Sequence, residues 1–270
     1  MYDELLAQLK DIKGKDDLEK LKLFLSKKYN TTHLPKNIDI LCRLAPKEVK
    51  RYQSLLFSKP VRTSSGLAPV AIMSKPFDCP TQAQCTFCPG GPDSAHGDTP
   101  KSYPGGSPAH LRGERNNYDP YLQVFNRLEH YALLHQDFSK VELIIMGGTF
   151  TTYPQSYRED FITYALKAMN DFSALFFDGK GNLDTVTFLD FFELPAPVDE
   201  PNRIKHIHAQ LLKMKGTTTL EQEQKRNETT HVRRVVEQVD MNRVLTYDLR
   251  PAIGEILYGR PVKYPTTNPY

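Results

Sequence analysis

The sequence lacks the features that mark secreted and membrane proteins. Only four of its 270 residues are cysteines, and three of these are clustered, so they make a poor disulfide framework for a secreted fold. No apolar run approaches the length that a bilayer-spanning helix needs. The N-terminus is charged from Asp3 onward and has no apolar core, so we expect no signal peptide. We therefore expect a cytoplasmic chain with no membrane partner.

The positive charge of the chain is concentrated near its N-terminus. Residues 1–74 carry 14 Lys and Arg against 8 Asp and Glu, a net charge of +6, whereas the whole chain has a net charge of +3. This composition is compatible with a surface that binds a polyanion, but it is equally that of an ordinary solvated helical face. The basic candidates in this region are Lys47, Lys50, Arg51, Lys59 and Arg62.

Apolar runs alternate with helical periodicity through the middle of the chain. Residues 67–76 and 140–150 are predicted to contain buried strands, and helices are predicted at 118–136 and 153–172. This order indicates parallel βα units, in which ligands bind at the carboxyl ends of the strands. Helices are also expected over residues 3–29, with a break at Gly14, and over the polar stretch 218–238.

Cys79, Cys85 and Cys88 form a C-x5-C-x2-C cluster directly after the first expected strand. Thiolates are soft ligands that select zinc, copper(I) or iron–sulfur clusters. A four-iron cluster on three thiolates keeps one iron open, which is what radical S-adenosylmethionine enzymes require. The commonest spacing in these enzymes is C-x3-C-x2-C, so the five-residue first gap is a departure. A structural zinc or unligated thiols are the alternatives. Zinc needs a fourth ligand, for which the candidates are Cys42, His96 and His110.

A second candidate site follows the second expected strand. Gly147 and Gly148 end this strand, and Thr149 follows them. Two glycines in this place often form only a tight turn. Next to a cysteine loop they also allow the polar end of a cofactor to approach the backbone, with the threonine available for a hydrogen bond.

Four segments together resemble one known family, the catalytic subunit of Elongator. They read KPVRTSSGLAPVAIMSKP, CTFCPGGPDS, YDPYLQVFNRL and KVELIIMGGTF, and the resemblance runs from Lys59 to Arg158 and more loosely through LEQEQKRNET. That family joins a radical S-adenosylmethionine domain to an acetyltransferase domain and modifies the wobble uridine of tRNA. The resemblance implies formation of 5-carboxymethyluridine from acetyl-CoA by radical chemistry.

The resemblance also implies roles for individual residues. The three clustered cysteines would bind a 4Fe-4S cluster, and Lys140 would contact acetyl-CoA. The basic residues from Lys47 to Arg62 correspond to a region associated with tRNA binding. The residues implied to lie beside S-adenosylmethionine are Phe87, Gly147, Gly148 and Thr149.

These observations predict an α/β protein, a partial (βα) barrel of the radical S-adenosylmethionine type preceded by a helical basic region. The expected division is a tRNA-binding region over residues 1–62, the partial barrel over 63–235 and an irregular tail over 236–270, without the acetyltransferase domain. We therefore expect a fragment or truncated form of a tRNA-modifying enzyme. Other Elongator subunits or a second copy of the chain are candidate partners. The alternatives are another radical S-adenosylmethionine enzyme and a zinc-stabilised RNA-binding module without catalytic activity.

Overall fold

The computed structural model describes residues 1–45, 48, 51–52, 55–56, 63, 65–78, 88, 90–94, 97–134, 136–194 and 200–239. Within these ranges no helix is long and apolar enough to cross a membrane. Several residues singled out from the sequence lie outside the described part of the chain. They are Lys47, Lys50, Lys59, Arg62, Cys79, Cys85, Phe87 and His96.

The centre of the fold is a parallel sheet in the order β1-β2-β3. Its strands are β1 (Ala68–Met73), β2 (Lys140–Met146) and β3 (Arg233–Val239). Ala68 pairs with Val141, and Met73 pairs with Met146, so the first two strands end at the same level. The prediction of an α/β fold with parallel βα units is therefore confirmed.

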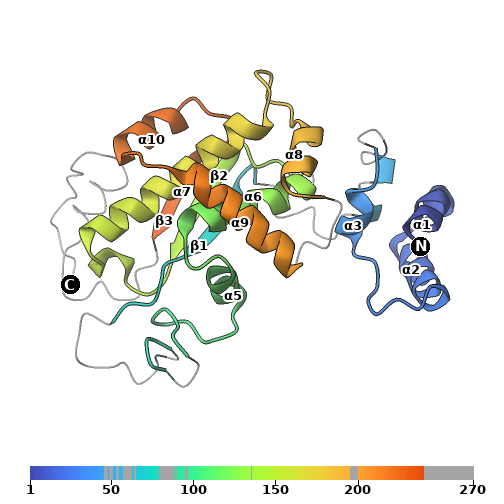
Figure 1. Cartoon of the computed structure of the whole chain (residues 1–270), viewed down its shortest axis with the longest axis horizontal. Helices are drawn as coiled ribbons and strands as arrows, with labels where there is room; N and C mark the ends of the chain where they lie inside the picture. Colours follow the sequence, from blue (N-terminus) through green and yellow to red (C-terminus); the bar gives the residue numbers. More distant parts are fainter. Residues whose placement is uncertain are drawn as a thin grey trace.

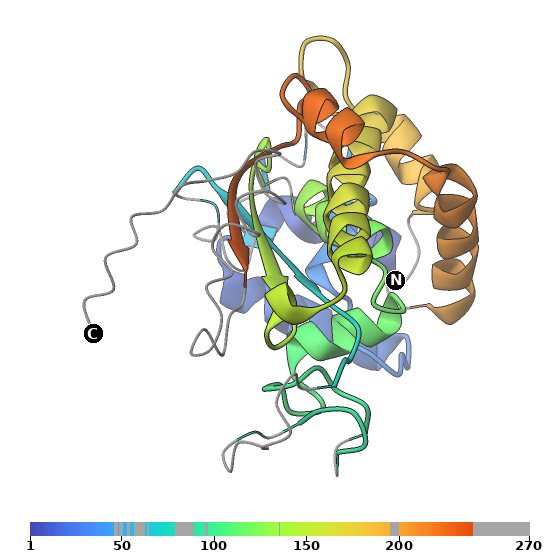
Figure 2. The same cartoon turned by 90° about the vertical axis from the view of Figure 1, so that its left-hand side faces the viewer.

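Two long helices pack on one face of the sheet (Figure 2). Helix α6 (Pro120–Leu133) follows β1, and α7 (Gln155–Phe176) follows β2. Asp119 caps α6 because its carboxylate accepts hydrogen bonds from the N–H groups of Tyr121 and Leu122, and proline occupies the first helical position. The main core lies between these helices and the buried residues of the strands, such as Val70 and Leu143.

Four further helices surround this core (Figure 1). Helix α5 (Pro108–Arg115) precedes α6, and α8 (Thr185–Phe191), α9 (Pro201–Lys215) and α10 (Leu220–Asn227) follow α7. Asn170 of α7 donates to the Glu223 carboxylate at 2.7 Å and accepts from Asn227 at 2.8 Å, so a buried polar network attaches α10 to α7. Asn227 also donates to Val232 O, which holds the approach to β3.

Strand β3 corrects part of the sequence analysis. The stretch 218–238 was expected to be one polar helix, but α10 ends at Asn227 and the chain becomes a strand at Arg233. Strand β3 reaches Val239, so residues 236–239 are not part of an irregular tail. The β-branched residues Val232, Val235 and Val236 favour a strand, and pairing with β2 supplies the hydrogen bonds that stabilise it.

The N-terminal region forms a small hydrophobic cluster of its own. It contains α1 (Tyr2–Gln8), a short 3-10 turn (Leu9–Asp11), α2 (Lys15–Lys28) and α3 (Asn37–Leu41). Leu5, Leu18 and Leu25 are buried in this cluster, which is distinct from the core around the sheet. The expected helical break at Gly14 is confirmed, since α2 begins immediately after it.

Candidate functional site

The candidate site lies at the edge of the sheet where β1 and β2 end. Ser74 follows β1, and its N–H donates to Met146 O at 2.9 Å, so the pairing of the two strands continues to their last residues. Gly147 has φ +132°, and a β-carbon placed on it would overlap Ser74 Oγ. The absence of a side chain at Gly147 therefore serves the close approach of the two strand ends.

The chain that leaves β1 toward the cysteine cluster is held by the start of α7. Lys75 N–H donates to the Tyr157 hydroxyl at 3.0 Å, and the rings of Phe77 and Tyr153 lie 4.2 Å apart between centroids. Burial raises the pKa of Tyr157, which keeps its hydroxyl neutral. The Tyr153 hydroxyl in turn donates to Gly147 O. The same aromatic groups thus fix both strand ends.

Cys88 begins a folded loop that returns to this edge. It is in no disulfide within the described chain, it is partly buried, and its thiol donates to Gly90 O at 3.0 Å. Gly91 N–H donates to Thr99 Oγ1 at 3.0 Å, and Gly91 also pairs with Asp98 in a short parallel bridge. These bonds give the loop after Cys88 a defined shape.

Lys101 connects this loop to the glycine turn. A β-carbon on Gly91 would lie 2.6 Å from Lys101 Cε, and one on Gly148 would lie 3.2 Å from Lys101 Cβ and from Lys101 O. Gly148 has φ +77°, a conformation that L side chains rarely adopt. Both glycine positions therefore adjoin the same residue, Lys101, which connects the loop after Cys88 to the glycine turn.

Of the three clustered cysteines, only Cys88 lies in the described part of the chain, so the fit to a soft metal group can be judged only at this position. Cys88 offers a thiol that is in no disulfide within the described chain, which is the donor type that iron–sulfur clusters and zinc require. No group of three or more His, Cys, Asp or Glu that could hold a metal ion occurs in the described chain. Because Cys79 and Cys85 lie outside it, the three-cysteine ligand set and its zinc alternative stay predictions.

The structure does not bring Lys140 to this edge. Lys140 is the first residue of β2, exposed, and pairs with Arg233, so it lies six residues and about 20 Å from Met146 along the strand. Cys42 is partly buried against the main core, and burial raises its pKa to about 11. His110 is buried on α5, 6.2 Å from the Tyr118 ring. Arg51 is exposed, with its guanidinium 5.5 Å from the Tyr52 ring.

Three residues of the site were missed in the sequence. Ser74 and Tyr153 flank the strand ends that the sequence located, so their nearness to Gly147 follows once the strands are paired. Lys101 gives no such signal, since it lies in the middle of a long polar loop. Only the folded loop shows that it contacts both glycine positions.

The fold and the site define a class: an α/β protein of parallel βα units with a glycine turn at the carboxyl edge of its sheet, against which the loop after Cys88 folds. Residues 1–64 match the model of a family described as the ELP3 N-terminal domain. The chain is 44% identical over 154 residues to Elongator complex protein 3 of Bos taurus, and the match covers 55% of this chain and 28% of the relative. It is 47% identical over 137 residues to tRNA uridine(34) acetyltransferase of Methanocaldococcus infernus, covering 51% and 26%.

Elongator complex protein 3 of Saccharomyces cerevisiae is also similar, at 43% identity over 153 residues, 55% of this chain and 27% of the relative. These matches confirm the resemblance to the catalytic subunit of Elongator. The chain spans somewhat more than a quarter of the length of these relatives. Among solved structures, the archaeal Methanocaldococcus infernus Elp3 with an N-terminal deletion (1–46) is similar at 23% identity and a TM-score of 0.35, over 65% of this chain and 23% of that one.

Proposed function

We propose that this chain is the N-terminal and partial radical S-adenosylmethionine portion of a tRNA wobble-uridine-modifying acyltransferase. The observation that carries the proposal is the position of Lys101, which adjoins both Gly148 of the glycine turn and Gly91 of the loop that follows Cys88. The relatives named tRNA uridine(34) acetyltransferase and Elongator complex protein 3 support acetyl transfer with tRNA as substrate, and acetyl-CoA is the donor in our proposal. The name Elongator complex protein 3 also supports other Elongator subunits as partners.

In this proposal Cys79, Cys85 and Cys88 hold a 4Fe-4S cluster, and the residues beside S-adenosylmethionine are Phe87, Gly147, Gly148 and Thr149. Such a cluster supplies reductive cleavage of S-adenosylmethionine when it is bound. The chain's own contribution is positioning. Tyr153 and Ser74 fix Gly147, and Lys101 keeps the loop of Cys88 against the same edge.

The contribution of the N-terminal region is electrostatic. Lys47, Lys50, Arg51, Lys59 and Arg62 are the proposed tRNA contacts. Phosphate contacts by Lys and Arg give an affinity that falls as salt rises, because counterions are released on binding. Lys140, at the opposite end of β2, is the proposed acetyl-CoA contact and lies on a separate part of the surface.

Anaerobic reconstitution with iron and sulfide tests the proposal. We expect the full chain to turn brown, to bind about four iron atoms and to cleave S-adenosylmethionine when reduced. Cys88→Ser should lose the cleavage activity. Cys42→Ser is the matched control and should keep it, because Cys42 is packed against the main core.

Two outcomes would contradict the proposal. One is a colourless protein with a single tightly bound zinc, which would favour the RNA-binding module. The other is a Cys88→Ser variant that cleaves S-adenosylmethionine as fast as the unsubstituted chain.

A further inference from the structure

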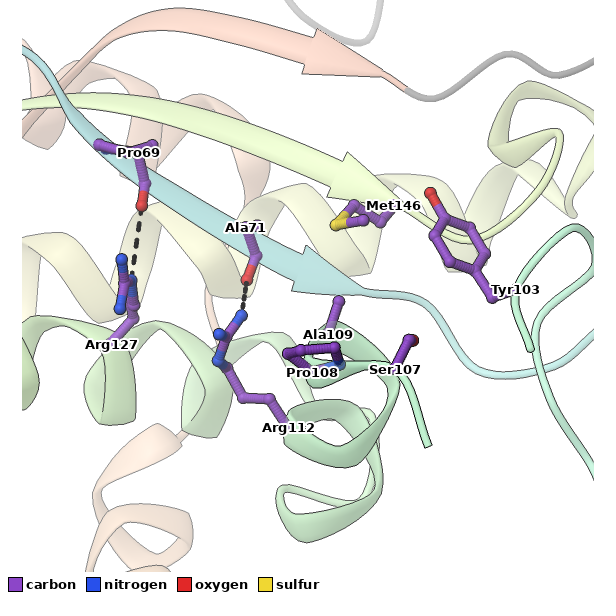
Figure 3. Close-up of a pocket in the computed structure, with 9 residues that line it drawn as sticks. All are labelled: Pro69, Ala71, Tyr103, Ser107, Pro108, Ala109, Arg112, Arg127 and Met146. Carbon is purple, nitrogen blue, oxygen red and sulfur yellow. Dashed lines mark hydrogen bonds between the residues drawn. The ribbon is translucent and has the colours of Figure 1, made fainter. Parts of the chain in front are cut away.

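The free edge of β1 is closed by arginine side chains. Strand order places β1 at one edge of the described sheet. Arg112 of α5 donates to Ala71 O at 3.2 Å, and Arg127 Nε of α6 donates to Pro69 O at 3.5 Å (Figure 3). The two guanidinium groups are therefore fixed side by side along the strand edge.

A cavity of about 400 Å³ lies between this edge and the start of α5. This volume is within the usual range for small-molecule sites. Among the described residues that line it, the two arginines are the only charged ones and none is a carboxylate. The rest of the wall is mostly apolar and includes Pro69, Ala71, Tyr103, Pro108, Ala109 and Met146 (Figure 3).

The spacing of the arginines suits a single anion. Their acceptors, Pro69 O and Ala71 O, are two residues apart on one strand, which is about 7 Å. A guanidinium has five N–H donors, more than the described hydrogen bonds of Arg127 use. Two groups at this separation can both donate to one phosphate placed between them, the pairing for which arginine is best suited.

The electrostatic potential around the cavity is positive. The described contacts of Arg127 are Pro69 O, the Tyr131 hydroxyl at 2.9 Å and the Tyr131 ring, and none of them is a carboxylate. The pKa of His130 is lowered first by burial and then by the charges of Arg127, Arg112 and Arg115. An anion in the cavity would reduce the repulsion between the positive charges of these arginines.

We propose that this cavity binds an organic phosphate, a phosphate ester whose organic body contacts the mostly apolar wall. Arg112 and Arg127 hold the phosphate, and the apolar wall holds the body. Met146 lines the cavity and directly precedes Gly147, so the ligand lies next to the candidate cofactor site. This inference rests on the proposed function, which supplies two sources for the ligand: a nucleotide of the RNA substrate or the phosphopantetheine arm of the acyl donor.

Isothermal titration calorimetry on the full chain tests this proposal without iron or S-adenosylmethionine. The probes are uridine 5′-monophosphate and 4′-phosphopantetheine, which separate the two sources, and inorganic phosphate, which lacks an apolar body. We expect one organic phosphate to bind once per chain and more tightly than inorganic phosphate. Arg112→Gln and Arg127→Gln should weaken binding roughly 10–100-fold, since each removes charged hydrogen bonds.

Two further variants keep the test decisive. Arg115→Gln is the matched control, because Arg115 is exposed on the same helix and does not line the cavity. Ala109→Leu fills the cavity without changing charge, should weaken binding at least tenfold, and decides the matter if an arginine variant fails to fold. Absence of binding by both organic phosphates, or equal weakening by Arg115→Gln, overturns the proposal. Binding by a chain that does not cleave S-adenosylmethionine would leave this proposal standing and reject only the proposed function.

Discussion

At the scale of single residues, the glycines after β2 show what the sequence motif is for. Gly147 combines a positive φ with the space that Ser74 Oγ occupies, and Gly148 combines a positive φ with contact to Lys101. The motif was interpreted as room for a cofactor to approach the backbone. In the structure much of that room is taken by the chain's own side chains, so the glycines first serve to bring the two strand ends together.

Gly147→Ala should therefore destabilise the fold. A β-carbon would meet Ser74 Oγ, and φ +132° is unfavourable for alanine, so we expect a loss of about 2–4 kcal/mol in the free energy of unfolding, measured by urea denaturation. Gly179→Ala is the control, because no atom lies within 4 Å of its β-carbon position, and it should change stability by less than about 0.5 kcal/mol. Equal stability of the two variants would show that the strand ends move apart without cost.

At the scale of secondary structure elements, β1 depends on helices for the hydrogen bonds that a neighbouring strand would supply. Proline at position 69 has no N–H to satisfy, and its carbonyl accepts from Tyr131 at 2.8 Å. Gln123 of α6 accepts from Met73 N–H at 2.7 Å and donates to Met73 O at 2.8 Å. This side chain therefore replaces a strand at the point where β1 leaves for the cysteine segment.

Gln123→Leu should loosen the end of β1 at Met73. It leaves two buried backbone groups without partners, which costs about 2–5 kcal/mol. We expect a lower urea midpoint and faster hydrogen exchange of the Met73 amide. Gln155→Leu, on the exposed start of α7, is the control and should change neither. Unchanged protection of the Met73 amide in Gln123→Leu would contradict this role.

At the scale of the whole molecule, a buried carboxyl on β3 makes stability depend on pH. The side chain of Glu237 is 4% exposed, and its Oε2 pairs with Arg234 at 2.7 Å. Its Oε1 has no hydrogen-bond partner within the described chain. Burial raises the pKa of Glu237 to about 7, although Arg234 opposes this shift. The folded chain therefore holds this proton more tightly than the unfolded chain, for which the pKa is near 4.5.

The sign of the dependence follows from that difference. The contribution of Glu237 to stability is complete below about pH 4.5 and is lost as pH rises through 7, in total on the order of 3 kcal/mol. Glu237→Gln should match the unsubstituted chain near pH 4.5 and be more stable at pH 8, as measured by urea denaturation at both values. The exposed Glu228→Gln is the control. A Glu237→Gln difference that is the same at both pH values would rule out this titration.

The sequence alone determined the parallel βα order and the common edge of the two motifs. The reason is local: apolar periodicity defines β1, β2 and the helices after them, and the carboxyl ends of parallel strands share one edge. This is why Cys88 and Gly147 were expected together and why Lys140, at the other end of its strand, could have been recognised as separate. The motif resemblance also identified the relatives without reference to the fold.

Only the tertiary structure decided the rest. The strand character of Arg233–Val239 depends on pairing with a partner 93 positions earlier at its first residue, since Arg233 pairs with Lys140, and no local pattern contains that partner. The contact of Lys101 with two glycines, the edge-closing bonds of Gln123 and the cavity beside Arg112 and Arg127 likewise join residues distant in sequence. Their positions are set by how helices pack on the sheet, which depends on side chains from several segments at once.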